Sequence, residues 1–403
     1  MGRYDEGGSV LFTHISDEVA FLATSDGLEI IDVSNKTNPQ LISEYPLADT
    51  TRSVFVQGDF AYLARNTVGV EVVNISDLSN PEKADYFCDD SAYNIDVFVA
   101  GDYAYVAEGD KGLEILDKTD PENLVQEGQY DDSTGTSLSV HVVGNYAFVA
   151  DYDDGLEIID VSNPSSPNRI GHFNDGMKAE DVVIVGDYAF VADSNTGLKI
   201  INITDLTSPN KVDQYDCTVA ESVFVYNNFA LVGRDFFEVD ILDVSDPEKV
   251  TYIDHKSVSG SVNEITVLNG YAYFSAASSG LVIAKVGYDA DGDDLTYYEE
   301  TSVYFTDPND NDSDNDLLND WDEIFTYNTD PNDSDSDNDD VSDYEEIIAG
   351  TDPLDPEDFP ITTTPPSTTT SPTEEASINQ SILGLSILFL FGVSFAAFIK
   401  KKK

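Results

Sequence analysis

Three segments in the last third of the chain carry aspartates at alternate positions. They read Asp289-Ala-Asp291-Gly-Asp293, Asp312-Ser-Asp314-Asn-Asp316 and Asp335-Ser-Asp337-Asn-Asp339, and they begin 23 residues apart. A tight loop turns alternate side chains towards one centre, and Ca²⁺ takes six to eight oxygen ligands from carboxylates, carbonyls and water. The segments contain the hard oxygen donors that Ca²⁺ prefers and no His or Cys. We therefore expect calcium loops, with Ca²⁺ as the cofactor.

The ligand spacing follows the twelve-residue loop of an EF-hand. That loop uses carboxylates at positions 1, 3, 5 and 9, a backbone carbonyl at position 7 and a bidentate Glu at position 12. The two complete sets are Asp312, Asp314, Asp316, Leu318, Asp320 and Glu323, and then Asp335, Asp337, Asp339, Val341, Asp343 and Glu346. The first loop is partial, with Asp289, Asp291, Asp293, Leu295 and Glu300 but Tyr297 at position 9.

The loops depart from an EF-hand in two ways. Position 6, normally glycine, is Asp294, Leu317 and Asp340, and a leucine is unfavourable in the left-handed conformation that this position needs. Flanking helices are missing, since only short stretches such as Tyr344–Ala349 have a helical pattern. Tandem loops followed by Thr-Asp-Pro resemble bacterial and archaeal thrombospondin type 3 repeats. That resemblance implies calcium-binding spacers.

The charge of the chain is extreme and uneven. The net charge is −59, and no Lys or Arg occurs between Lys285 and Lys400. Such a surface repels phosphates, which argues against nucleic acid as a partner. Crowded acids without counter-charges keep the metal-free repeats expanded, and calcium is expected to draw them into a stiff rod. A disordered acidic linker is the alternative, but it does not require the ligand spacing.

A longer repeat fills the chain before these loops. Gly101–Asp117 reads GDYAYVAEGDKGLEILD, and related stretches recur at intervals of 41 to 43 residues, seven in all. In the third copy the sequence predicts strands at Asp96–Ala100, Tyr103–Ala107, Leu113–Leu116 and around Leu124–Tyr130, separated by turn residues. Four antiparallel strands at this period are typical of a propeller blade. We predict an all-β, seven-bladed β-propeller of four-stranded antiparallel blades.

The third strand of the copies carries a family resemblance. It reads GLEIIDVS at 27–34 and again at 155–162, GVEVVNIS at 69–76 and GLKIINIT at 197–204. These motifs resemble the LVIVD-repeat family, which is taken to consist of β-propellers of bacterial and archaeal surfaces. The sixth copy departs from the motif, with RDFFEVD at 234–240 and no glycine, and the seventh loses the Asp. The resemblance implies a fold and a location but no agreed ligand.

A polar rim is expected where the inner strands begin, at the mouth of the propeller channel. The residues five or six positions before each repeat anchor are Arg52, Ser53, Asp96, Ser139, Glu180, Asp181, Glu221, Ser222, Asn263 and Glu264. Their mostly acidic character suits a cation or a basic group, although a solvated rim of an acidic protein has the same composition. His14 and His141 occupy a repeat position that is otherwise Phe, which predicts packed side chains. Cys88 and Cys217 are predicted to lie too far apart for a disulfide.

The C-terminal part contains the segments of a membrane anchor in the expected order. We divide the chain into a propeller at 9–287, calcium repeats at 288–358, a Thr/Pro/Ser-rich stalk at 359–381, a transmembrane helix at 382–399 and a basic tail at 400–403. The apolar run is long enough for a bilayer core, and the four lysines predict a cytoplasmic C-terminus. The N-terminal residues have no signal-peptide pattern. An incomplete N-terminus is the preferred explanation, and a tail-anchored cytosolic protein is the alternative.

These parts predict a single-pass cell-surface protein whose propeller faces outwards. We expect recognition or adhesion, with the membrane and a protein or glycan at the propeller face as partners, and no enzymatic activity. One alternative is an extracellular propeller enzyme acting on surface glycans, which requires converging rim carboxylates at a cleft, one of them with a raised pKa. Another is a structural component of the cell envelope. The lack of an LPxTG-type motif favours an archaeal over a bacterial source.

Overall fold

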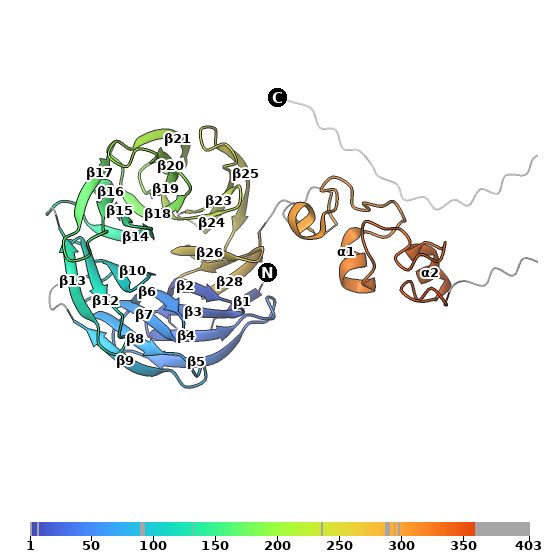
Figure 1. Cartoon of the computed structure of the whole chain (residues 1–403), viewed down its shortest axis with the longest axis horizontal. Helices are drawn as coiled ribbons and strands as arrows, with labels where there is room; N and C mark the ends of the chain where they lie inside the picture. The colour runs from blue at the N-terminus through green and yellow to red at the C-terminus, as the bar shows by residue number, and fades with distance from the viewer. Residues whose placement is uncertain are drawn as a thin grey trace, which may run out of the picture. The chain divides into compact units, whose positions relative to one another are not determined.

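Seven four-stranded antiparallel sheets are arranged around a central channel in the computed structural model (Figure 1). Consecutive strands pair within each sheet, because short turns join segments rich in Val, Ile, Tyr and Phe. The third copy matches its prediction closely, with strands at Asp96–Ala100, Tyr103–Ala107, Leu113–Asp117 and Val125–Tyr130. The predicted all-β, seven-bladed propeller is confirmed.

The strands follow blade by blade. The first three blades are β2 (Val10–Ser16), β3 (Val19–Thr24), β4 (Gly27–Asp32) and β5 (Gln40–Pro46); β6 (Thr51–Gln57), β7 (Phe60–Arg65), β8 (Gly69–Asn74) and β9 (Glu82–Phe87); and β10 to β13, given above. The next three are β14 (Ser137–Val143), β15 (Tyr146–Asp151), β16 (Gly155–Asp160) and β17 (Asn168–Phe173); β18 (Ala179–Val185), β19 (Tyr188–Asp193), β20 (Gly197–Asn202) and β21 (Asn210–Asp216); and β22 (Ala220–Tyr226), β23 (Phe229–Arg234), β24 (Glu238–Asp243) and β25 (Thr251–Ser257). The seventh is β26 (Glu264–Leu268), β27 (Tyr271–Ser275), β28 (Leu281–Lys285) and β1 (Gly2–Tyr4).

The structure describes residues 2–5, 8–88, 93–131, 133–234, 237–286, 291–293, 295–296 and 299–358. The chain divides into two compact units, Met1–Ser334 and Asp335–Lys403, and the boundary at residue 288 stays a prediction. The predicted stalk at 359–381, membrane helix at 382–399 and tail at 400–403 lie outside the described residues. None of the helices in the described ranges has the length and hydropathy of a membrane-spanning segment.

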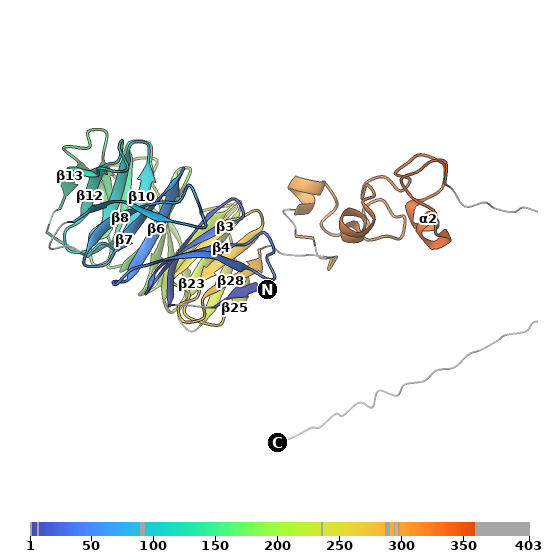
Figure 2. The same ribbon diagram turned by 90° about the horizontal axis from the view of Figure 1, so that it is seen from below.

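The apolar core lies between the blades. The second and third strands of each blade are buried on both faces, whereas the outer strands are largely half-buried or exposed. Seven apolar clusters fill the spaces between neighbouring blades, and one of them joins Tyr273 and Ile283 of the seventh blade to Leu22 and Ile31 of the first. Stacking therefore buries both faces of sheets that could not form a core alone. Seen from the side, the blades form a thick disc (Figure 2).

The N-terminal strand closes the ring. β1 pairs antiparallel with β28, with Gly2 opposite Ile283 and Tyr4 opposite Leu281, and so completes the seventh blade. Tyr4 is buried in the cluster between the last and first blades. The propeller therefore includes residues 2–4, which precede the predicted start at residue 9. Strands from the two ends of the propeller share one sheet, which ties the first and last blades together.

Two local rules of the repeat have clear physical causes. The Asp or Asn that ends the third strand accepts a hydrogen bond from the backbone N–H two residues on, as Asp32 does from Ser34 at 2.8 Å. Asn74 and Asn202 accept the same bond, from the N–H of Ser76 at 3.0 Å and of Thr204 at 2.9 Å. The glycine at the start of this strand, or directly before it, has a positive φ and leaves no room for a Cβ. In the sixth blade Phe237 takes its place with φ 71°.

Short helices follow the acidic loops. They are η1 (Glu299–Tyr304), α1 (Asp320–Asp322), η2 (Glu323–Tyr327) and α2 (Asp343–Ala349), of which η1 and η2 are π-helical turns. Asn319 and Ser342 cap α1 and α2 through side-chain oxygens. The helical stretch predicted at Tyr344–Ala349 is confirmed within α2. Each of η1, η2 and α2 carries the Glu predicted at position 12 of its loop.

Candidate functional site

The loop from Asp312 to Glu323 brings its first three aspartates together. Ligand oxygens of Asp312, Asp314 and Asp316 all lie within 4.8 Å of one another. The backbone N–H of Asp316 donates to Oδ1 of Asp312 and to Oδ1 of Asp314, both at 3.1 Å, and the N–H of Leu317 donates to Oδ2 of Asp312 at 3.0 Å. The loop therefore holds three carboxylates in a fixed cluster. This arrangement concentrates negative charge at one point.

Glu323 adds a buried carboxylate beside this cluster. It is the first residue of η2 and is fully buried. Its Oε1 accepts a hydrogen bond from Thr329 at 3.3 Å, whereas Oε2 has no hydrogen-bond partner. Burial, together with the charges of Asp314 and Asp316, raises the pKa of Glu323 to about 8. A buried, partly unpaired carboxylate near three others is costly unless a cation is bound among them.

The loop from Asp335 to Glu346 repeats this geometry in the second unit. Asp335, Asp337 and Asp339 form the same cluster, and the N–H of Asp339 donates to Oδ1 of Asp335 at 3.0 Å and of Asp337 at 3.2 Å. Glu346 is fully buried in α2, and neither of its oxygens has a hydrogen-bond partner. Burial and the neighbouring aspartates raise the pKa of Glu346 to about 7. Two separate segments have thus built the same oxygen-only cluster.

Position 9 makes contacts that the sequence did not predict. Oδ1 and Oδ2 of Asp320, a predicted ligand, accept hydrogen bonds from the N–H and Oγ of Ser313, both at 2.8 Å. Asp343 holds Ser336 in the same way, at 3.0 and 2.7 Å. These aspartates stand outside the clusters of three and fasten the start of each loop to the helix that follows. A sequence signal existed, since both complete loops have Ser at position 2 and the partial loop has neither this Ser nor the Asp.

The partial loop joins three of its predicted ligands. Oxygens of Asp291, Asp293 and Glu300 lie within 4.8 Å of one another, and Asp289 lies outside the described residues. At position 7, Leu295 and Leu318 are buried and Val341 is half-buried. Their apolar side chains anchor the backbone whose carbonyl the calcium scheme uses. All three segments therefore offer oxygen donors of the kind that suits calcium.

The backbone of both complete loops turns through left-handed conformations. Position 4 has φ 66° at Asn315 and 63° at Asn338, and position 6 has φ 87° at Leu317 and 74° at Asp340. The strain predicted for Leu317 is confirmed, because a branched side chain is disfavoured at positive φ. Leu317 is also exposed, so little packing offsets this cost. The left-handed turns point successive N–H groups at the aspartates.

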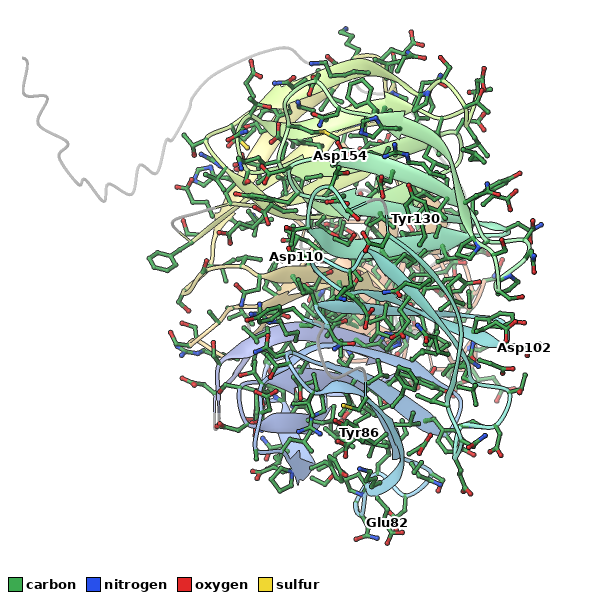
Figure 3. The ribbon with its side chains drawn as sticks, turned by 90° about the vertical axis from the view of Figure 1, so that its left-hand side faces the viewer. Glu82, Tyr86, Asp102, Asp110, Tyr130 and Asp154 are labelled. Atoms are coloured by element: carbon green, nitrogen blue, oxygen red, sulfur yellow. The ribbon has the colours of Figure 1, made fainter. Side chains whose placement is uncertain are left out.

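A separate cavity of about 630 Å³ opens at the channel mouth of the propeller. Inner-strand starts and turns between the second and third strands line it: Leu11, Phe12, Arg52, Ile95, Asp96, Leu138, Ser139, Tyr152, Lys178, Glu180, Asp181, Ser194, Asn195, Val219, Glu221, Asn263 and Glu264. Asp110 and Asp154, in such turns, lie on one side of the ring and Asp102 on the other (Figure 3). The cavity opens on the former side. Eight of the ten predicted rim residues line it, all except Ser53 and Ser222.

Two cavity aspartates each tie three consecutive blades together. Oδ1 of Asp96 accepts a hydrogen bond from Oγ of Ser53, in the preceding blade, at 2.7 Å, and Oδ2 accepts one from the N–H of Val140, in the following blade, at 3.0 Å. Asp181 makes the same pair of bonds with Ser139 at 2.7 Å and Val223 at 2.9 Å. Serine and acid therefore alternate around the ring. Ser53, one of the two rim residues outside the cavity lining, has this supporting role.

The acids in the channel carry raised pKa values. Burial raises the pKa of Asp96 to about 6, and it raises the pKa of Asp181. The pKa of Glu264, the counterpart residue in the seventh blade, lies well above its usual value because of burial and the charges of Asp181 and Asp96. All three residues are half-buried and line the cavity. They concentrate negative charge at the channel mouth.

An aromatic arc lines the channel wall. The rings of His14, Phe55, Phe98 and His141 contact one another in sequence, with centroids 4.8 to 5.0 Å apart. Burial lowers the pKa of both histidines to about 4. The prediction of packed histidines is confirmed, but their stacking through two phenylalanines was not predicted. No disulfide joins Cys88 and Cys217, as predicted.

The comparisons with known proteins agree with this architecture. The model of the LVIVD repeat matches residues 7–46, 48–86, 93–132, 134–175, 176–217 and 219–253. The chain is similar in fold to a crystal structure of the computationally designed protein Ika8, with a TM-score of 0.54, 7% identity and coverage of 71% of this chain and 98% of that one. It is also similar to BamB from Moraxella catarrhalis, with a TM-score of 0.50, 16% identity and coverage of 70% and 84%. None of the curated proteins matches. The chain therefore belongs to the LVIVD-repeat family.

Proposed function

We propose that this protein is a cell-surface recognition or adhesion protein that presents its propeller on calcium-ordered repeats. The apolar run at 382–399 is the proposed membrane anchor, with the propeller outside the cell, where calcium is abundant. The partner at the propeller face is a protein or glycan. The thrombospondin type 3-like loops form the stem that holds the propeller away from the surface. A scaffold component of the cell envelope would use the same stem without a soluble ligand.

The acidic loops carry this proposal. Glu323 and Glu346 are fully buried, and three of their four oxygens have no hydrogen-bond partner. Each stands next to three aspartates whose oxygens converge. Carboxylates in such a cluster repel one another, and a bound Ca²⁺ converts that repulsion into attraction. The loops contain no softer donors, which favours Ca²⁺ over zinc or copper.

A calcium titration of the whole chain tests the proposal. We expect added Ca²⁺ to change the circular dichroism and to reduce the hydrodynamic radius, because binding orders segments that repel themselves when metal-free. A double variant, Glu323→Gln with Glu346→Gln, should lose most of both changes. An unchanged radius and spectrum at millimolar Ca²⁺ would show that the acidic repeats are not calcium sites.

The channel-mouth cavity bears on the second candidate, an enzyme acting on surface glycans. It supplies a pocket with several carboxylates of raised pKa, which such an enzyme needs. However, both oxygens of Asp96 and of Asp181 accept hydrogen bonds that fix the blades, which favours binding over acid–base chemistry. Release of reducing ends from surface glycans by the parent chain, lost in Glu264→Gln, would favour the enzyme. We expect no such release.

A further inference from the structure

The channel-mouth cavity has an excess of negative charge at a size suited to a small organic group. The cavity has a volume of about 630 Å³, and five carboxylates and two basic residues line it. Binding pockets for small molecules fall in this range of volume, roughly 300 to 1,000 Å³. A single metal ion would fill little of it. The cavity therefore favours an organic cation as the occupant.

Glu264 is a cavity acid whose contacts differ from those of Asp96 and Asp181. Glu264 follows the alternating pattern of Asp96 and Asp181 around the ring but has one more methylene group. Among the described residues it makes no blade-to-blade hydrogen bonds of the kind that those two aspartates make. The backbone N–H of Ile265 interacts favourably with the carboxylate of Glu264. Glu264 is half-buried and lines the cavity. A half-buried carboxylate close to the charges of Asp181 and Asp96 lowers the stability of the fold, and a binding role accounts for its presence there.

The two bases of the cavity do not neutralise this acid. The Nζ of Lys178 donates to Asp153 at 2.8 Å and lies 4.0 Å from the ring centroid of Tyr152. The Nε of Arg52 donates to Asn66 at 3.1 Å. Both groups are thus engaged at the edge of the mouth. Lys178 over Tyr152 also shows that this wall accepts an ammonium group on an aromatic face.

We propose that the cavity binds a primary ammonium group, with Glu264 as its main acceptor and Asp96 and Asp181 as supporting charges. An ammonium group has three donors and suits several converging carboxylates. The aliphatic stem behind it would lie along Phe12, Leu138 and Val219, which line the cavity. This inference specifies the ligand class of the proposed recognition function and rests on it. The ammonium comes either from a free amine or from a lysine of a partner protein.

Calorimetry on the whole chain distinguishes these sources. The probes are pentylamine, 1-pentanol of the same length without the charge, and the tripeptide Gly-Lys-Gly with both ends blocked. We expect pentylamine or the blocked peptide to bind and pentanol not to bind. Binding of pentylamine favours a free amine, and binding of the peptide alone favours a protein lysine. Equal binding of pentanol, or binding of CaCl₂ at the propeller in place of either amine, would overturn the proposal.

Matched variants connect binding to Glu264. We expect Glu264→Gln to weaken the amine interaction at least tenfold, whereas Glu18→Gln, at an exposed position of the first blade, should leave it unchanged. Glu264→Gln removes a poorly solvated charge without changing the size of the side chain, so its melting temperature should equal or exceed that of the parent. Undiminished binding in Glu264→Gln would contradict the assignment. The hydrodynamic radius is measured with and without Ca²⁺ on the same samples. This second readout shows whether the calcium proposal fails independently of amine binding.

Discussion

Single residues in the acidic loops have distinct roles that their shared charge conceals. Asp312, Asp314 and Asp316 converge, whereas Asp320 fastens the loop through Ser313. The sequence predicted which residues take part, because the ligand spacing is regular. It did not predict the role of Asp320, because an acid that accepts from a serine and one that binds a metal occupy the same position in the pattern.

The buried glutamate at position 12 should control calcium affinity. Glu346→Gln keeps the size of the side chain but removes one charge and the bidentate carboxylate, so we expect the affinity of its loop to fall at least about tenfold. Glu345→Gln changes the exposed neighbour and should have little effect. Calorimetric titration with Ca²⁺ compares the two variants with the parent. Equal losses in both would mean that bulk charge, rather than a built site, attracts the ion.

Leu317 should limit the affinity of its loop. Its φ of 87° costs a branched residue about 1 kcal/mol, and glycine removes that cost. We therefore expect Leu317→Gly to bind Ca²⁺ about fivefold more tightly. Leu317→Ala retains a Cβ at the same backbone angle and should give no comparable gain. If alanine and glycine act alike, the exposed leucine side chain and not the backbone is responsible.

At the scale of the elements, the sequence repeat predicts the strands of the blades well, but it does not predict how the ring of blades closes. The strands of the third copy follow from alternating turn residues and apolar runs, and their bounds differ from the structure by a residue at most. β1 has only three residues, Gly2–Tyr4, and carries no repeat anchor. Its pairing with β28 depends on the ring bringing distant segments together. Local sequence patterns do not contain that information.

The sixth blade offers a test of the repeat glycine. Phe237 has φ 71° where other copies have glycine, and its side chain is half exposed. We expect Phe237→Gly to stabilise the propeller by about 1 kcal/mol, because relief of the backbone strain exceeds the small loss of packing. Thermal unfolding measures the effect, with Phe237→Ala as the control that keeps the strain. A lower melting temperature for the glycine variant would show that the phenyl ring packs in solution.

At the scale of the whole molecule, the propeller keeps a group of acids at its channel mouth while most of its core is apolar. Asp96, Asp181 and Glu264 come from alternate blades and have raised pKa values. The sequence placed these residues at the rim because the repeat fixes their position. It could not show that two of them tie blades together and that Glu264 does not, since that difference depends on side-chain length and on the neighbouring blades.

The charge of Glu264 should make folding stability depend on pH. Its pKa is raised in the folded state, so its contribution to stability is fully present below its ordinary pKa of 4.5 and is lost as the pH rises through the folded value. Arg52, Lys178, Glu180 and Glu221 also line this cavity and are common to parent and variant. The melting temperature of Glu264→Gln should therefore match that of the parent near pH 4.5 and exceed it increasingly at higher pH. If the difference in melting temperature between variant and parent stayed constant across this pH range, ionisation of Glu264 would not destabilise the folded state.

Counting calcium ions on the intact chain by native mass spectrometry tests the central claim most directly. We predict two tightly bound ions, one in each complete loop, and a third, weaker one at the partial loop around Asp291, Asp293 and Glu300. Changing Asp312 and Asp335 to Asn should remove the two tight ions and leave the propeller folded. No bound calcium, or a count that these two substitutions leave unchanged, would contradict the account.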